Sequence, residues 1–184
     1  MSPPPLVLAS TSPQRRAILE QLGIPFEVAA PGYEELGDDP VEHAVGKARS
    51  VDSDRPVLGI DTAVVFGGRV YGKPADAAAA ERMLGELAGH THEVVSGLCL
   101  RTAAWEEQHR EVALVTFRPL SPRDLTTYVS VGEWKGRAGA YAIQGRGAAL
   151  VERIEGDYLN VVGLPAALLV RLLVERFPGV YDFG

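Results

Sequence analysis

The sequence predicts an α/β protein in which antiparallel hairpins are mixed into the sheet. Short apolar runs rich in branched residues alternate with segments of helical periodicity, which is typical of strand–helix units. Two strands are expected at about 92–101 and 107–118, and the few residues between them favour a hairpin. The chain has 184 residues and no Gly/Ser linker, so we expect a single domain, residues 1–184, whose two lobes share one core.

The first half of the chain alternates strands and helices. A short buried strand in PPPLVLAS is entered by prolines and ends at Ser10. Ser12 and Pro13 are the residue types of a helix N-cap and first helical position, and Gly23 is a fitting stop. The further elements expected here are a strand in FEVAA, a turn-rich loop PGYEELGDDP, a helix over 41–51, a buried strand VLGIDTAVVF, a brief return strand in GGRVYGKP and an alanine-rich helix over 75–87.

The second half begins with the predicted hairpin. After it we expect a helix from Ser121 to about 131, and then the glycine-rich loop GEWKGRAGAYAIQGRG with a short strand inside it. ALVERI reads as an edge strand, and LPAALLVRLLVERF as a last helix that Pro178 and Gly179 stop.

Composition and charge exclude several classes of protein. Hydrophobic residues make up 46% and charged residues 23%, which argues against a disordered, fibrous or membrane protein. The net charge of −6 argues against binding to polymeric nucleic acid, yet a few converging cations could still hold a small anion. The single cysteine, Cys99, suits a reducing compartment, and we find neither a signal peptide nor a membrane span. We therefore expect a cytoplasmic protein without a membrane partner.

The turn ASTSPQRR is a possible phosphate seat. A helix N-terminus exposes unpaired backbone N–H groups, and here the hydroxyl residues Ser10 and Ser12 precede it while Arg15 lies just inside. The alternative is an ordinary Ser-Pro helix start with solvated arginines, which is common in proteins. On this segment alone, that plain explanation is favoured.

Asp61 interrupts an almost unbroken apolar strand. A carboxylate there is costly to desolvate unless it is paired, hydrogen-bonded or bound to a metal. The preceding acidic loop holds Glu34 and Glu35, and Mg²⁺ needs only one or two carboxylates together with substrate phosphates. A solvated acidic loop is the better explanation of either glutamate taken singly, so the loop is informative only alongside Asp61.

Two lysines and one loop complete the candidates. Lys47 lies on a predicted helix and Lys73 in the GKP turn, and each could neutralise phosphate oxygens or simply be solvated. In the glycine-rich loop, Gln144 offers both a donor and an acceptor, which suits the edge of a base. A loop that is glycine-rich only because it turns tightly is an equally good explanation. His90 and His92 have no third ligand placed with them and are expected to be ordinary hairpin residues.

Taken together, these segments resemble the Maf family of nucleotide pyrophosphatases. The resemblance runs from LASTSPQRRAILEQLGIPFEV to GDYLNVVGLPAALL, and its most specific parts are the S-P-x-R start, VLGIDTAVV, YGKP followed by a helix, and GRAGAYAIQGRGA. It implies a long mixed β-sheet with flanking helices and two lobes around a cleft, similar to the inosine-triphosphate pyrophosphatase fold. It also implies a homodimer that hydrolyses the bond between the α- and β-phosphates of nucleoside triphosphates, with Mg²⁺ or Mn²⁺ as the divalent cofactor.

The resemblance also implies roles for particular residues. Asp61 is the catalytic acidic residue, and Glu35 holds the metal with it. Substrate binding falls on the remaining positions, namely Ser10, Ser12, Arg15, Lys47, Thr62, Lys73 and Gln144.

One departure and one subfamily signal qualify the resemblance. The family start usually reads S-P-R-R, and here Gln14 replaces the first arginine, although the second is kept as Arg15. The segment AYAIQG, which contains Gln144, resembles the branch of the family that acts on dTTP and UTP. This substrate choice is physically reasonable, because an amide can pair with the edge of uracil or thymine. The alternatives are a 7-methyl-GTP pyrophosphatase and a non-catalytic, nucleotide-sensing inhibitor of septum formation.

Overall fold

A computed structural model describes residues 5–181 as an α/β protein built on one mixed sheet of seven strands. The strand order is β2-β1-β3-β5-β6-β7, with β4 paired to β3 outside that path. Strands β1, β2 and the first part of β3 pair in parallel, whereas β3–β4 and β6–β7 are antiparallel. The predicted fold class is therefore confirmed. Prolines 3 and 4, expected to lead into the first strand, lie outside the described residues.

The elements follow the predicted order closely. In chain order they are β1 (Leu6–Ala9), α1 (Pro13–Gln21), β2 (Phe26–Ala29), α2 (Pro40–Arg49), β3 (Val57–Phe66), β4 (Arg69–Tyr71), α3 (Ala77–Leu87), β5 (Thr91–Arg101), β6 (Glu106–Phe117), α4 (Pro122–Val131), β7 (Val151–Glu155), α5 (Tyr158–Val162) and α6 (Ala166–Arg176).

The predicted short strand inside the glycine-rich loop is wrong. The segment forms two 3₁₀ helices, Ala138–Ala140 and Arg146–Leu150. Gly139 and Ala140 adopt positive φ angles of 67° and 64°, which a β-strand does not tolerate. The backbone therefore bonds locally instead of joining the sheet.

The described chain divides into two compact units. Among the described residues, unit 1 comprises residues 5–61, 96–111 and 163–181, and unit 2 comprises residues 62–95 and 112–162. Each contains its own buried apolar cluster, the first around β1 and α2 and the second around α3, α4 and the glycine-rich loop. Strands β3, β5 and β6 each contribute residues to both units.

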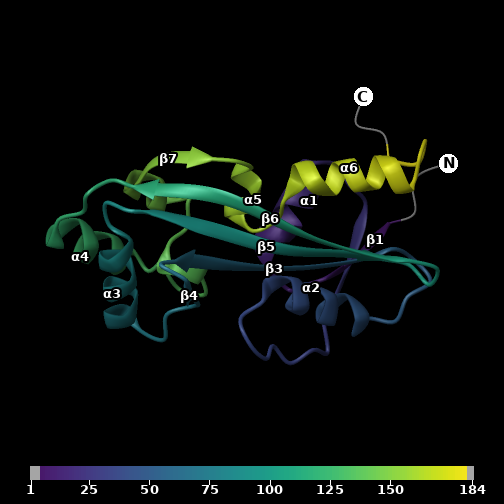
Figure 1. Cartoon of the computed structure of the whole chain (residues 1–184), viewed down its shortest axis with the longest axis horizontal. Coiled ribbons are helices and arrows are strands. Elements are labelled where there is room, and N and C mark those ends of the chain that lie inside the picture. The colour runs from purple at the N-terminus through teal and green to yellow at the C-terminus, as the bar shows by residue number, and fades with distance from the viewer. Residues whose placement is uncertain (1–4, 182–184) are drawn as a thin grey trace. The chain divides into compact units, whose positions relative to one another are not determined.

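In unit 1, helices cover both faces of the sheet, with α6 and α2 on opposite sides of the strands (Figure 1). Asp39 caps α2 by accepting a hydrogen bond of 2.9 Å from the Val41 backbone N–H, and Pro40 presets its first turn. The largest fully buried side chains of this unit are aliphatic, including Leu6, Leu8, Ile18, Leu58 and Leu98. Helix α2 packs on the alternate strand positions, where Val7, Val57 and Cys99 form a buried cluster with its alanines.

In unit 2, helices α3 and α4 pack together (Figure 1). Both begin with a capped N-terminus. Asp76 accepts from the Ala79 N–H at 2.7 Å, and Ser121 and Asp124 form a reciprocal capping box at the start of α4. The serine cap explains why the start of α4 could be predicted from sequence, whereas α3 begins two residues after the expected start at residue 75.

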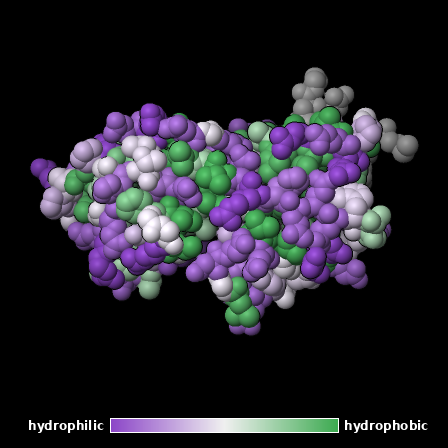
Figure 2. Space-filling view, in the orientation of Figure 1, coloured by the Kyte–Doolittle hydropathy of each residue, from purple (hydrophilic) through white to green (hydrophobic). Residues whose placement is uncertain are grey.

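The surface is mixed in character. On the face shown in Figure 2, hydrophilic side chains cover most of the surface and apolar ones occur in patches. Among the described residues, no helix combines the length and apolar character needed to cross a membrane.

Candidate active site

The candidate site in unit 1 begins where α2 meets strand β3. The two elements approach so closely that a Cβ atom at Gly59 would lie 2.1 Å from the carbonyl oxygen of Ala44. Asp61 follows Gly59 by two residues on β3, and Lys47 follows Ala44 by three on α2. The absence of a side chain at Gly59 is thus what allows α2 to bring its functional residues to the strand.

Lys47 connects the two predicted metal-binding carboxylates. Its Nζ atom lies 2.6 Å from Asp61 Oδ1 and 2.5 Å from Glu35 Oε1. The side chains of Lys47 and Asp61 are only 9% and 16% exposed, whereas that of Glu35 is 47% exposed. Such burial requires the two charges to be paired, which explains the acid within the apolar strand. Three of the predicted site residues are thereby in direct contact.

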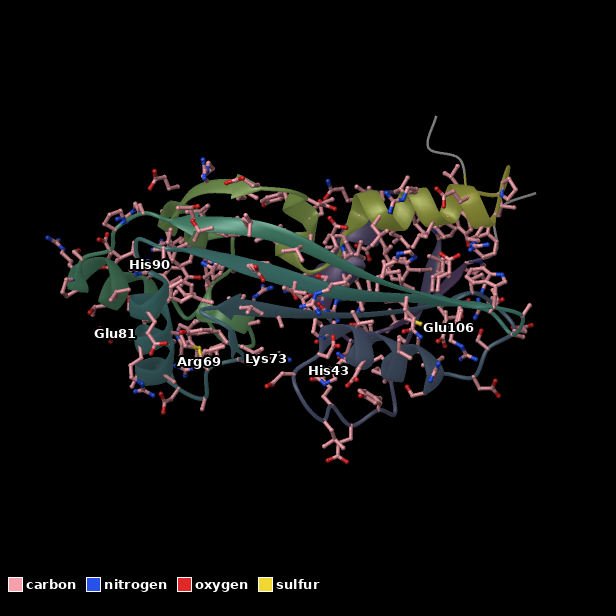
Figure 3. All side chains as sticks on the ribbon, viewed as in Figure 1. His43, Arg69, Lys73, Glu81, His90 and Glu106 are labelled. Carbon is pink, nitrogen blue, oxygen red and sulfur yellow. The ribbon has the colours of Figure 1, made fainter. Side chains whose placement is uncertain are left out.

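His43 is a site residue that the sequence analysis missed. Its Nδ1 lies 3.4 Å from Asp61 Oδ2, and its Nε2 lies 3.2 Å from the carbonyl oxygen of Leu36. The ring is buried on α2 (Figure 3) and packs against Tyr33, with 6.1 Å between the ring centroids. One signal could have found it, because His43 precedes Lys47 by four residues and therefore shares its face of the helix.

The predicted phosphate seat forms a second group in unit 1. Arg15 donates from Nη1 to Ser10 Oγ at 3.1 Å and from Nε to the carbonyl oxygen of Gly163 at 3.0 Å. Burial lowers the pKa of the Arg15 guanidinium, while the negative charges of Asp61 and Glu35 act in the opposite direction. This electrostatic influence links Arg15 to the carboxylate group.

Ser12 occupies the N-cap position of α1, but its hydroxyl makes no capping hydrogen bond. It donates instead to Gln14 Oε1 at 3.0 Å, while the Ser12 backbone N–H donates to Ser10 Oγ at 3.2 Å. Gln14, the residue that departs from the family pattern, thus holds the serine hydroxyl at the start of the helix.

The remaining predicted residues are described within unit 2. Thr62 follows Asp61 directly on β3, and Lys73 is exposed in the turn after β4 (Figure 3). The Gly139 N–H donates to the carbonyl oxygen of Gly72 at 3.2 Å, which ties the turn before Lys73 to the glycine-rich loop. The roles assigned to Thr62, Lys73 and Gln144 stay predictions.

The loop that presents Gln144 is held on both sides. Tyr128 Oη accepts a hydrogen bond of 3.0 Å from the Ala142 N–H, and the Glu133 carboxylate accepts from the Arg146 and Gly147 N–H groups at 3.0 and 3.2 Å. Gln144 itself is exposed. A rigid loop with an exposed amide is suited to reading a ligand edge at little entropic cost.

His90 and His92 do not form a metal pair. His92 is buried, and its Nε2 lies 2.9 Å from Tyr141 Oη. Burial lowers the pKa of His92 to about 4, so the ring is neutral at pH 7. Cys99 is likewise buried, and desolvation raises the pKa of its thiol to about 12, which makes it a poor nucleophile.

Among residues 5–181, the donors that fit a divalent cation are Glu35, His43 and Asp61. One ligand atom from each lies within 4.8 Å of the others. Two carboxylates with one imidazole are a suitable donor set for Mg²⁺ or Mn²⁺. The Lys47 ammonium between the carboxylates shows that this position already stabilises positive charge. The residues present therefore fit the expected metal.

Two carboxylates in contact with a lysine, within the electrostatic influence of an arginine, are side chains suited to an enzyme that acts on phosphorylated substrates. Comparison with known proteins agrees with this class. The family model described as Maf-like protein matches residues 5–176. The chain therefore belongs to the Maf-like protein family.

Individual relatives extend the comparison over nearly the whole chain. A protein of Symbiobacterium thermophilum named dTTP/UTP pyrophosphatase is 48% identical over 92% of this chain and 93% of its own length. Proteins with the same name from Gloeobacter violaceus and Deinococcus radiodurans are 47% and 44% identical. The alignments cover 92% and 98% of this chain and 95% and 96% of those relatives.

Proposed function

We propose that this protein is a nucleoside triphosphate pyrophosphatase that hydrolyses dTTP and UTP to the nucleoside monophosphate and pyrophosphate. The observation that carries the proposal is the contact of Lys47 with both Asp61 and Glu35, since it supports the roles proposed here for the three side chains: catalytic carboxylate, phosphate-binding cation and metal ligand. The names of the relatives support the choice of pyrimidine substrate. Modified pyrimidine triphosphates are expected to be accepted as well.

In this proposal, the residues of unit 1 act on the triphosphate. A divalent cation bound by Glu35 and Asp61 would supply charge neutralisation for the phosphate oxygens. Asp61 orients or deprotonates the water that attacks the α-phosphorus in line. Arg15 and Lys47 stabilise the negative charge that builds up on the phosphates and the leaving pyrophosphate.

The residues around the phosphates and the base have supporting roles. The hydroxyls of Ser10 and Ser12 and the cation of Lys73 bind phosphate oxygens, while Thr62 and Gln144 read the base. A base with the wrong edge is rejected because it cannot form both hydrogen bonds with the Gln144 amide. The protein is further proposed to be a cytoplasmic homodimer that acts on free nucleotides. Neither polymeric nucleic acid nor a membrane is expected as a partner.

The test is a panel of nucleoside triphosphates with separate readouts for pyrophosphate and for the monophosphate. We expect dTTP and UTP to give the highest kcat/KM, and equal amounts of the two products. Asp61→Asn should lower kcat at least about a hundredfold, as expected on removing a group that acts in the transition state. Asp52→Asn, at an exposed aspartate outside the site, is the matched control.

The alternatives are outcomes of the same panel. Preference for 7-methyl-GTP would replace the pyrimidine assignment with the other branch of the family. Nucleotide binding without pyrophosphate release would favour the non-catalytic role in septum formation. Full activity in Asp61→Asn would remove Asp61 from the mechanism.

A further inference from the structure

His43 brings a nitrogen donor to a carboxylate site, and neither of its ring nitrogens faces a hydrogen-bond donor in the contacts described above. Nδ1 faces the Asp61 carboxylate at 3.4 Å and Nε2 faces the Leu36 carbonyl oxygen at 3.2 Å. Both of these groups are acceptors. A neutral imidazole carries one N–H, so it can donate to only one of them.

The contact with Leu36 defines one of the two neutral tautomers of His43, in which Nε2 carries the proton. When Nε2–H donates to the Leu36 carbonyl, the lone pair of Nδ1 points at Asp61 Oδ2. Two facing lone pairs repel each other unless a cation lies between them. A ring N–H bound to a backbone carbonyl is also the usual support of a histidine that binds a metal through its other nitrogen.

The spacing of the donors agrees with shared coordination. Two neighbouring ligands of an octahedral cation, each at about 2.1 Å from it, lie about 3 Å apart. The 3.4 Å between His43 Nδ1 and Asp61 Oδ2 is close to that value. Asp61 Oδ2 is also the oxygen that Lys47 does not contact, because Lys47 binds Oδ1.

We propose that His43 is a third protein ligand, through Nδ1, of the divalent cation assigned to Glu35 and Asp61, and that it shifts the metal preference of the site from Mg²⁺ toward Mn²⁺. Imidazole binds Mn²⁺ and later transition metals better than it binds Mg²⁺, which prefers oxygen ligands and retained water. This inference rests on the proposed metal-dependent function, but it concerns binding in the absence of nucleotide.

The experiment measures metal binding to the full-length, substrate-free protein. Titration with Mn²⁺ is followed by the loss of the free-ion signal in electron paramagnetic resonance, and Mg²⁺ affinity is obtained by competition. Pulsed measurements on the bound Mn²⁺ detect coupling to an imidazole nitrogen. We expect His43→Leu to weaken Mn²⁺ binding at least about tenfold and to abolish the coupling, while Mg²⁺ affinity changes less than about threefold.

His109→Leu is the matched control, because His109 contacts Glu107 and is outside the donor group. It should keep both the affinity and the nitrogen coupling. Protein grown with ¹⁵N-histidine provides a second measurement that needs no variant at His43, since the coupling must change to the ¹⁵N pattern.

The result that overturns the proposal is bound Mn²⁺ without nitrogen coupling, or an equal loss of Mn²⁺ and Mg²⁺ affinity in His43→Leu. Pyrophosphate release from dTTP or UTP without the coupling would reject His43 as a ligand and leave the proposed function standing. Coupling in a protein that hydrolyses no nucleotide would support the ligand and reject the proposed function.

Discussion

Lys47 Nζ lies 2.6 Å from Asp61 Oδ1, so the ammonium group occupies the space beside the carboxylate that a divalent cation would also seek. The same ammonium contacts Glu35, the second acidic residue of the group. Without substrate, the lysine and a metal therefore compete for the same negative charge.

Replacing this lysine should separate metal binding from turnover. In Lys47→Met, removal of the competing charge should raise Mn²⁺ affinity in the absence of nucleotide at least about tenfold. The loss of a phosphate-binding cation should lower kcat at least about a hundredfold. Metal titration and steady-state pyrophosphate release measure the two effects. Lys135→Met, at an exposed lysine, should change neither, and weaker Mn²⁺ binding in Lys47→Met would contradict the competition.

The exposed amide of Gln144 should determine the choice of base. Gln144→Ala removes both hydrogen-bonding groups while leaving the loop held by Tyr128 and Glu133. We expect the ratio of kcat/KM for dTTP over dATP to fall at least about tenfold, as expected when a base-reading contact is lost. Gln21→Ala, at an exposed position of α1, is the control. An unchanged ratio would reject Gln144 as the residue that reads the base.

His92 should make stability depend on pH. The unfolded chain takes up the proton near pH 6.5, whereas burial lowers the pKa of the folded group to about 4. The unfolded state therefore binds more protons between these values, and the free energy of unfolding falls as the pH falls through this window, by about 3 kcal/mol in total. Urea unfolding of wild type and His92→Phe from pH 4 to 7.5 should show a shallower slope in the variant. His90→Phe, at an exposed histidine, should keep the wild-type slope.

The close approach of α2 to β3 should make Gly59 intolerant of any side chain. In Gly59→Ala, the new methyl group meets the Ala44 carbonyl at 2.1 Å, and backbone cannot rotate away as a side chain can. We expect a loss of at least about 1–3 kcal/mol in the free energy of unfolding, together with lower activity because Lys47 is displaced from Asp61. Gly32→Ala meets no atom within 4 Å and is the control. Wild-type stability in Gly59→Ala would show that the helix can shift freely.

Much of the fold could be predicted because local chemistry decides it. Strand β3 was predicted with the bounds Val57–Phe66, since an apolar, branched run between turn residues has few other structures open to it. The start of α4 at Pro122 followed from its serine cap. The five-residue helix Tyr158–Val162 was missed because so short a helix leaves little periodicity in the sequence.

The site was less predictable because it depends on contacts between distant segments. Asp61 stood out as a charge in an apolar strand, but the path of the loop decides that Glu35 reaches Lys47. His43 gave no motif of its own, and its role follows only from the carboxylate and the carbonyl that face it. The strand wrongly expected in the glycine-rich loop shows the same limit, because Glu133 binds backbone groups there that a strand would have offered to a sheet.

His43 and Lys47 are carried by one short helix, whereas Glu35 comes from an exposed loop. A mutation that tilts or shifts that helix moves the imidazole and the ammonium together. A movement of the helix therefore changes metal preference and phosphate binding at the same time. A change in the loop, in contrast, moves Glu35 without moving His43 or Lys47. Laboratory evolution that moves the ligands relative to one another, without replacing any of them, should therefore accumulate its early changes around residues 31–38 rather than along the helix.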